Sequence, residues 1–120
     1  MTENDSTNDS AGDATKAKAL YKEGFALFVK GEVAEAIARY RDALEVDATL
    51  AIAWNGLSMA LAKQGDLEAA IEAAERLIEV EPDDPLSHTN LSRILMQKGM
   101  IPEAEDARAK AMGLQMKQGS

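Results

Sequence analysis

The residues of this chain that could do catalytic or metal chemistry are few, with one histidine, no cysteine and scattered carboxylates. His88 has no nucleophile or carboxylate placed beside it as a general-base partner, so a packing role is expected. Glu81, Asp83 and Asp84 lack the glycine-defined turn and the oxygen ligands of a calcium loop, which favours a turn followed by a helix cap. There is no phosphate-binding glycine loop and no metal-spaced His/Cys set. We therefore expect no enzyme, no cofactor and no metal site.

The charge balance excludes two further classes of partner. The chain has 13 Lys and Arg against 21 Asp and Glu, a net charge of −8. Nucleic acids and anionic membrane surfaces both require a face rich in Lys and Arg. No apolar run approaches the roughly 18–20 residues of a membrane span, and residues 1–15 lack the basic start and apolar run of a signal peptide. We expect no nucleic-acid partner, no membrane partner and a cytoplasmic location.

The N-terminal segment differs in composition from the rest of the chain. Residues 1–15, MTENDSTNDSAGDAT, contain four acidic residues, no basic residue and no large apolar residue beyond Met1. Such a segment cannot bury enough apolar surface to offset its ordering entropy. The sequence predicts a disordered acidic tail over residues 1–15, followed by a folded domain over residues 16–118.

A 34-residue period organises that domain. The matching columns include Gly31, Gly65 and Gly99; Ala36, Ala70 and Ala104; and Leu27, Leu61 and Leu95. A fixed period of this length is typical of helical solenoids. Each copy divides at its glycine into two stretches with helical periodicity, and Asp66 stands where it can cap the helix after Gly65. We expect repeats at 17–50, 51–84 and 85–118, with six antiparallel helices of about 14 residues.

These columns resemble the tetratricopeptide repeat. The residues that carry the resemblance are Leu20, Gly24, Leu27, Ala36, Tyr40 and Ala43 in the first copy; Trp54, Leu57, Ser58, Leu61, Ala70 and Pro82 in the second; and His88 in the Trp place, Leu91, Ser92, Leu95, Ala104 and Ala111 in the third. The resemblance covers residues 17–118. It implies an all-α, right-handed solenoid of three helix-turn-helix repeats that binds peptides or partner proteins in a concave groove. The small residues fit this fold, because a larger side chain where paired helices cross would push them apart.

In that fold the first helix of each repeat lines the concave face. The predicted groove residues are Lys18, Tyr21, Lys22, Phe25, Phe28, Val29, Ile52, Asn55, Gly56, Met59, Lys63, Leu86, Thr89, Asn90, Arg93, Met96 and Gln97. An apolar floor edged by Lys and Arg, on an otherwise acidic protein, favours an amphipathic partner with acidic residues. For Phe25 and Phe28 the alternative is packing between the helices of the first repeat.

The first repeat, LYKEGFALFVKGE, also looks like the opening repeat of co-chaperones that clamp the acidic C-terminal tails of heat-shock chaperones. The five clamp places hold Tyr21, Phe25, Gly56, Leu86 and Asn90. None of them is charged, so a terminal carboxylate would lose its hydration without gaining a charged donor. This favours a binding module that is not a carboxylate clamp.

Two functions remain open at this point. The first is a non-catalytic adaptor or chaperone-like scaffold that binds a peptide or helix of an unidentified partner protein. The alternative is a self-assembling structural protein whose repeats stack into oligomers. A solenoid needs a polar outer face at its end, and Glu105 and Arg108 replace apolar residues of the earlier repeats in the last helix. This favours a monomer or a weak homodimer.

Overall fold

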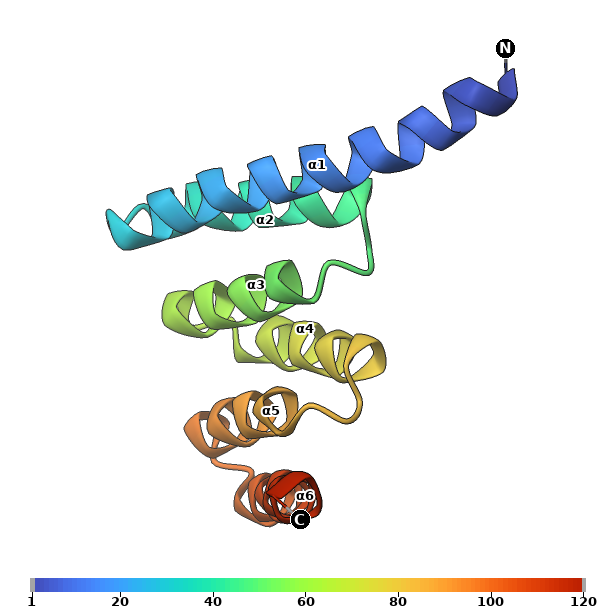
Figure 1. Ribbon diagram of the computed structural model, residues 1–120. Coiled ribbons are helices and arrows are strands. Elements are labelled where there is room, and N and C mark those ends of the chain that lie inside the picture. The colour runs from blue at the N-terminus through green and yellow to red at the C-terminus, as the bar shows by residue number, and fades with distance from the viewer. Residues whose placement is uncertain (1, 120) are drawn as a thin grey trace.

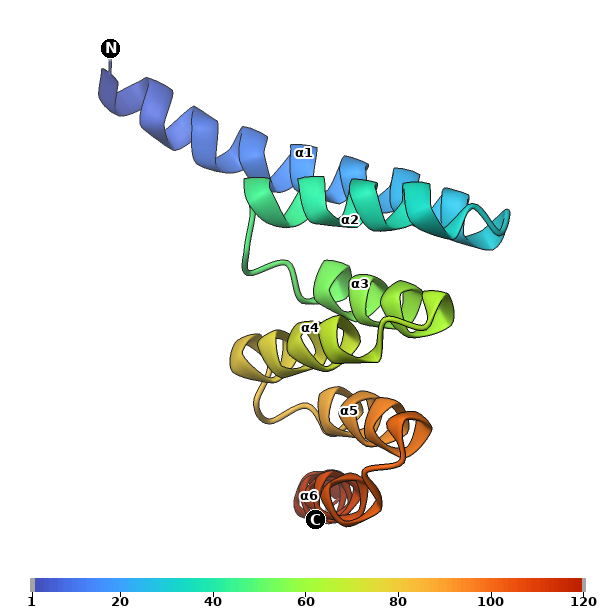
Figure 2. The same ribbon diagram turned by 180° about the vertical axis from the view of Figure 1, so that it is seen from behind.

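The computed structural model describes the backbone of residues 2–119 and the side chains of residues 12–119. Its helices are α1 (Thr2–Val29), α2 (Val33–Val46), α3 (Ala51–Gln64), α4 (Leu67–Val80), α5 (Pro85–Lys98) and α6 (Ile101–Gly119). Figures 1 and 2 show these helices stacked in chain order, each antiparallel to the one before it. Residues 2–119 contain no strand, and none of their helices is long and apolar enough to cross a membrane. The predicted all-α solenoid is confirmed.

The first helix extends further toward the N-terminus than the sequence predicted. Residues 12–15, expected as the end of a disordered tail, are helical and exposed, and Ala17 is the first buried side chain of the described part. Once a helix is nucleated by its packed portion, each added residue gains one hydrogen bond, which allows the helix to continue without further packing. The side chains of residues 1–11 lie outside the described residues. The limits of the tail and of the folded domain therefore stay predictions.

The turn inside each repeat is built as predicted. Gly31, Gly65 and Gly99 have φ values of 87°, 94° and 91°, a left-handed conformation that side chains with a Cβ rarely adopt. In the second turn the backbone N–H of Asp66 donates to the Leu61 carbonyl at 3.0 Å, and the Asp66 carboxylate accepts from the N–H of Ala69 at 3.3 Å. The predicted cap at Asp66 is confirmed.

The helices form an inner and an outer layer. Among the described residues α1 contacts α3 and α3 contacts α5, whereas α2 does not contact α4 and α4 does not contact α6. The layer whose helices touch is the inner layer of a curved stack, so α1, α3 and α5 line the concave side. The thinnest extent of the molecule is 20 Å, which is the thickness of about two helices.

Close crossings of small residues hold the layers together. A Cβ built on Gly24 would lie 2.8 Å from the ring of Tyr40 and 3.3 Å from the carbonyl oxygen of Ala36. In the third repeat the hydroxyl of Ser92 donates to the Ala104 carbonyl at 2.7 Å. The predicted approach of these columns is confirmed, and the crossing at Gly24 leaves no room for a larger side chain.

Tyr40 is the largest side chain of the core. It is 1% exposed, and a Cβ on Gly56 of the next repeat would also lie 2.8 Å from its ring. The rings of Tyr21 and Tyr40 stack with their centres 5.6 Å apart. Burial is the main reason why the pKa of Tyr40 rises to about 12, with the nearby Tyr21 adding to the shift. Tyr40 therefore joins α1, α2 and α3 into one core.

Candidate functional site

The large apolar side chains that remain exposed are concentrated on the inner layer. On α1, α3 and α5 they are Phe25, Val29, Ile52, Met59, Leu86 and Met96. All six belong to the predicted groove. Within residues 12–119 no large apolar side chain of α2 or α4 is exposed to this degree. Outside α6, which exposes Ile101, Met112 and Met116, the exposed apolar surface thus lies on one layer. Such a surface is typical of a binding face, which we call the inner face and define by the exposed residues of α1, α3 and α5.

In the first repeat the structure separates the two phenylalanines. Phe25 is 50% exposed, whereas Phe28 is half-buried and packs against the core. Tyr21 lies between the surface and the core, with its ring centre 6.2 Å from Phe25 and 5.6 Å from Tyr40. Burial raises the pKa of Tyr21. Phe25 thus contributes to the inner face on a rigid aromatic support, and Phe28 serves mainly in packing.

In the second and third repeats two predicted groove residues, Gly56 and Asn90, lie in the packing, Gly56 against the ring of Tyr40. Asn90 is only 4% exposed, and its amide donates to the hydroxyl of Ser58 at 2.7 Å. The side chain joins α5 to α3, so the prediction that Asn90 faces the groove is wrong. Asn55 is half-buried, with its amide 3.7 Å from the sulfur of Met59. Met59 itself is 40% exposed on the inner face.

Part of the inner layer carries positive charge without acidic neighbours on the same helix. Lys18, Lys22, Lys63 and Arg93 are exposed, and none of them takes part in the three ion pairs that the described side chains form. Helices α3 and α5 contain no acidic residue, whereas α4 contains four glutamates and one arginine. The part of the inner face that α3 and α5 form is therefore basic although the protein as a whole is acidic, whereas α1 also carries the exposed acids Asp13 and Glu23.

A cleft of about 820 Å³ lies at the C-terminal end of the solenoid, between α5 and α6. Its lining consists of Leu86, Thr89, Ser92, Arg93, Met96, Gln97, Arg108, Ala111, Met112 and Gln115. Five of these residues were predicted for the groove, and the structure brings them together. The residues of α6 were not predicted, because only the first helix of each repeat was expected to line the groove. One signal in the sequence could have indicated that α6 takes part. Arg108 stands in the same repeat column as Tyr40 and Ala74, and Tyr40 points toward the next repeat.

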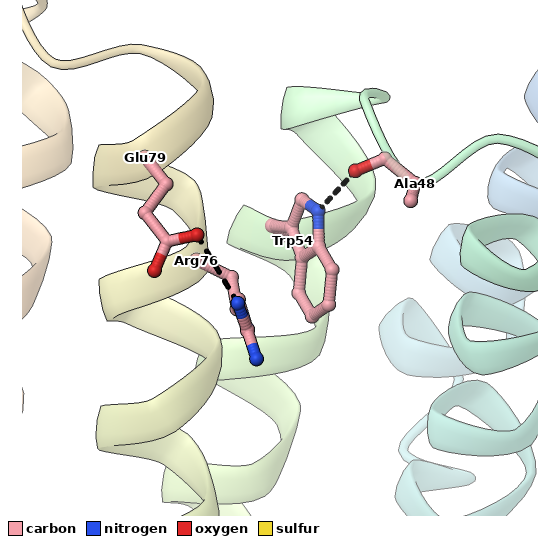
Figure 3. Close-up of polar contacts among 4 residues, drawn as sticks. All are labelled: Ala48, Trp54, Arg76 and Glu79. Carbon is pink, nitrogen blue, oxygen red and sulfur yellow. Dashed lines mark hydrogen bonds and ion pairs between the residues drawn. The ribbon is translucent and has the colours of Figure 1, made fainter.

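A second depression, of about 440 Å³, is lined by residues of α2, α3 and α4 around Trp54 and by none of the predicted groove residues. Figure 3 shows Arg76 of α4 beside the indole of Trp54, with its guanidinium held by Glu79 at 3.1 Å. The indole N–H donates to the Ala48 carbonyl at 2.7 Å. Trp54 therefore ties the loop between the first two repeats to α3.

His88 occupies the Trp54 column in the third repeat, and its ring also contacts a backbone carbonyl of the preceding loop. It is 8% exposed, and its Nε2 lies 2.8 Å from the carbonyl oxygen of Pro82. Pro82 stands 34 residues after Ala48, as His88 does after Trp54. The packing interpretation of His88 agrees with this equivalence.

Comparisons with known proteins give the family and the fold. A model described as the tetratricopeptide repeat matches residues 21–85 and 57–113. No curated protein sequence matches the chain significantly.

Solved structures of similar fold include a crystal structure of MamA, 27% identical, with a TM-score of 0.83 over 88% of this chain. The chain spans 62% of the MamA chain. The second TPR of Spaghetti (RPAP3), bound to the HSP90 peptide SRMEEVD, is 18% identical, with a TM-score of 0.86 over 95% of this chain and 98% of that one. The type III secretion translocator chaperone SycD of Yersinia enterocolitica, in an alternative dimer, is 22% identical, with a TM-score of 0.78 over 83% and 76% of the two chains. At 18% and 22% identity the similarity concerns the fold alone.

Proposed function

Because the chain belongs to the tetratricopeptide repeat family, whose members are non-catalytic interaction modules, we propose that its inner face binds a peptide or helix of a partner protein. The observation that carries this proposal is the restriction of exposed apolar side chains, outside α6, to α1, α3 and α5. Side chains such as Phe25 and Met59 can anchor a partner, because partly exposed aromatic and Met side chains adapt to and bury apolar groups. The folded binding domain covers residues 16–118, and its role is that of an adaptor or chaperone-like scaffold.

The partner segment is amphipathic and carries acidic residues. Lys18, Lys22, Lys63 and Arg93 are exposed on the same helices as the apolar side chains of the inner face, and α3 and α5 contribute no carboxylate to repel an acidic ligand. Exposed ion pairs add little to affinity, so the apolar contacts supply most of it and the charges steer and orient the segment.

This mode of binding is not a carboxylate clamp. Of the five clamp places, Gly56 lies against the ring of Tyr40 and Asn90 is engaged by Ser58. The others hold Tyr21, Phe25 and Leu86, none of which carries a positive charge. A terminal carboxylate at these places would meet no charged donor, which supports internal segments as ligands.

Selection from a displayed library of random peptides tests the proposal without a known partner. We expect the recovered peptides to combine apolar residues at helical spacing with Asp or Glu, and to bind at an affinity that falls as salt rises. Recovery of basic peptides, or of peptides whose affinity requires a free C-terminal carboxylate, would contradict the proposal.

Self-assembly is the second candidate function, because Ile101, Met112 and Met116 are exposed on α6. We expect a monomer with at most weak dimerisation, since Glu105 and Arg108 are exposed on the same helix and interrupt the apolar surface. Sedimentation equilibrium over a range of concentrations measures this. A dimer that persists at micromolar concentration would contradict the expectation and favour assembly.

A further inference from the structure

The cleft between α5 and α6 corresponds to a surface that is covered in the first two repeats. In the first repeat Tyr40 of α2 contacts Gly56 of α3. In the second repeat Ser58 accepts a hydrogen bond from Asn90 of α5, and the Ala62 carbonyl accepts one from Gln97 at 3.3 Å. Each of these surfaces thus holds the first helix of the following repeat.

In the third repeat no helix of residues 2–119 covers the same columns. Ser92, Met96 and Arg108 stand 34 residues after Ser58, Ala62 and Ala74, and all three line the cleft. Ala111 and Met112 follow Leu77 and Ile78 in the same way. Ala111 is as buried as Leu77, at 5% each, but Met112 is 51% exposed whereas Ile78 is half-buried. The shape of the cleft is therefore that of a seat for an α-helix.

The cleft between α5 and α6 differs in charge from the corresponding covered surfaces of the first two repeats. At the place of Tyr40 and Ala74 it has Arg108, which is exposed, and Arg93 lies in the same lining. None of the residues that line the cleft is acidic. Because Tyr40 touches Gly56, the residue that an incoming helix carries at the place of Gly56 would face Arg108. A carboxylate there would be matched with a cation.

We propose that the cleft between α5 and α6 binds an α-helix of a partner protein, seated as the first helix of a fourth repeat, with an Asp or Glu facing Arg108. This inference rests on the proposed function and names the class of segment and its place. The seated helix buries Met96 and Met112, and the arginines select for an acidic residue at one position. The partner therefore both occupies the inner face and closes the end of the solenoid.

A charge-swap experiment with the full chain tests this proposal. The probes are two helix-stapled, fluorescein-labelled peptides with the sequence of α3, one carrying Gly56→Glu and the other Gly56→Lys. We expect the native protein to bind the Gly56→Glu peptide about three- to fivefold more tightly, the range of an exposed ion pair, and Arg108→Glu to invert the order. The matched control is Lys110→Glu, which makes the same charge change at an exposed α6 position outside the cleft and should leave the order unchanged.

Three outcomes would overturn the proposal. These are an absence of binding by both peptides, an order that Arg108→Glu does not change, and dissociation of a dimer of the protein by the stapled peptide, seen in sedimentation, which would make a second copy of the chain the occupant. The variant Phe25→Ala separates this failure from that of the proposed function. One such result is that Phe25→Ala weakens the binding of library-selected peptides while Arg108→Glu leaves the affinities of the stapled probes unchanged. That result would support the inner face as a binding site and contradict only the assignment of the cleft.

Discussion

Replacement of Tyr40 by alanine is expected to lower the free energy of unfolding by about 3–5 kcal/mol, the cost of removing a fully buried aromatic ring. The ring is 1% exposed and fills the space that Gly24 and Gly56 leave between α1, α2 and α3. Its loss would leave a cavity at the junction of the first two repeats. Urea unfolding followed by circular dichroism measures the change, which is a large part of the stability of a small domain.

Two controls assign this loss to the packing of the ring against glycine. Tyr40→Phe should cost less than about 1 kcal/mol, because the described residues form no hydrogen bond to the Tyr40 hydroxyl. Gly56→Ala should cost about 1–3 kcal/mol in the native protein, since the added Cβ would lie 2.8 Å from the ring. In the Tyr40→Ala background the same change should cost almost nothing. An equal cost of Gly56→Ala in both backgrounds would contradict the proposed contact.

Truncation of the inner face should weaken ligand binding without unfolding the domain. Phe25→Ala and Met59→Ala are each expected to cost more than about 1 kcal/mol of binding free energy, a factor of at least about five, for a peptide selected from the library. Both side chains are at least 40% exposed, so their removal leaves no cavity in the core. Fluorescence anisotropy gives the affinity and circular dichroism gives the helicity.

The matched control for these variants is Ile101→Ala, since Ile101 is 45% exposed but lies outside both the inner face and the cleft. It should leave the affinity unchanged. Unfolding of the domain by both Phe25→Ala and Met59→Ala would instead place these side chains in the core and contradict the assignment of the inner face.

The repeat and its turns were predictable from the sequence because their physical requirements are local. The turn after each first helix requires a left-handed backbone conformation, which favours glycine at positions 31, 65 and 99. Close crossings of helices require small residues such as Ala36. Both requirements recur with the period of the fold. The family model and the solved structures support the same assignment.

What the sequence missed depends on contacts between repeats. Asn90 shares a repeat column with Lys22 and Gly56, and the residue types in this column do not indicate burial. Asn90 is buried because it packs against α3, where its amide donates to Ser58, 32 residues earlier. Arg108 and Met112 enter the cleft only because no helix follows α6 in the described chain. The exposure of such residues is set by the neighbour that covers them, which a helical pattern alone does not specify.

The position of a bound peptide tests the central claim most directly. Amide chemical shifts of the isotopically labelled protein, recorded while a library-selected peptide is added, locate the contact residue by residue. We expect the largest shifts along α1, α3 and α5 around Phe25, Met59 and Arg93, with small shifts at the Trp54 indole. Shifts centred on Trp54, Arg76 and the outer helices α2 and α4 would place the ligand in the depression around Trp54 and contradict the inner face as the binding site.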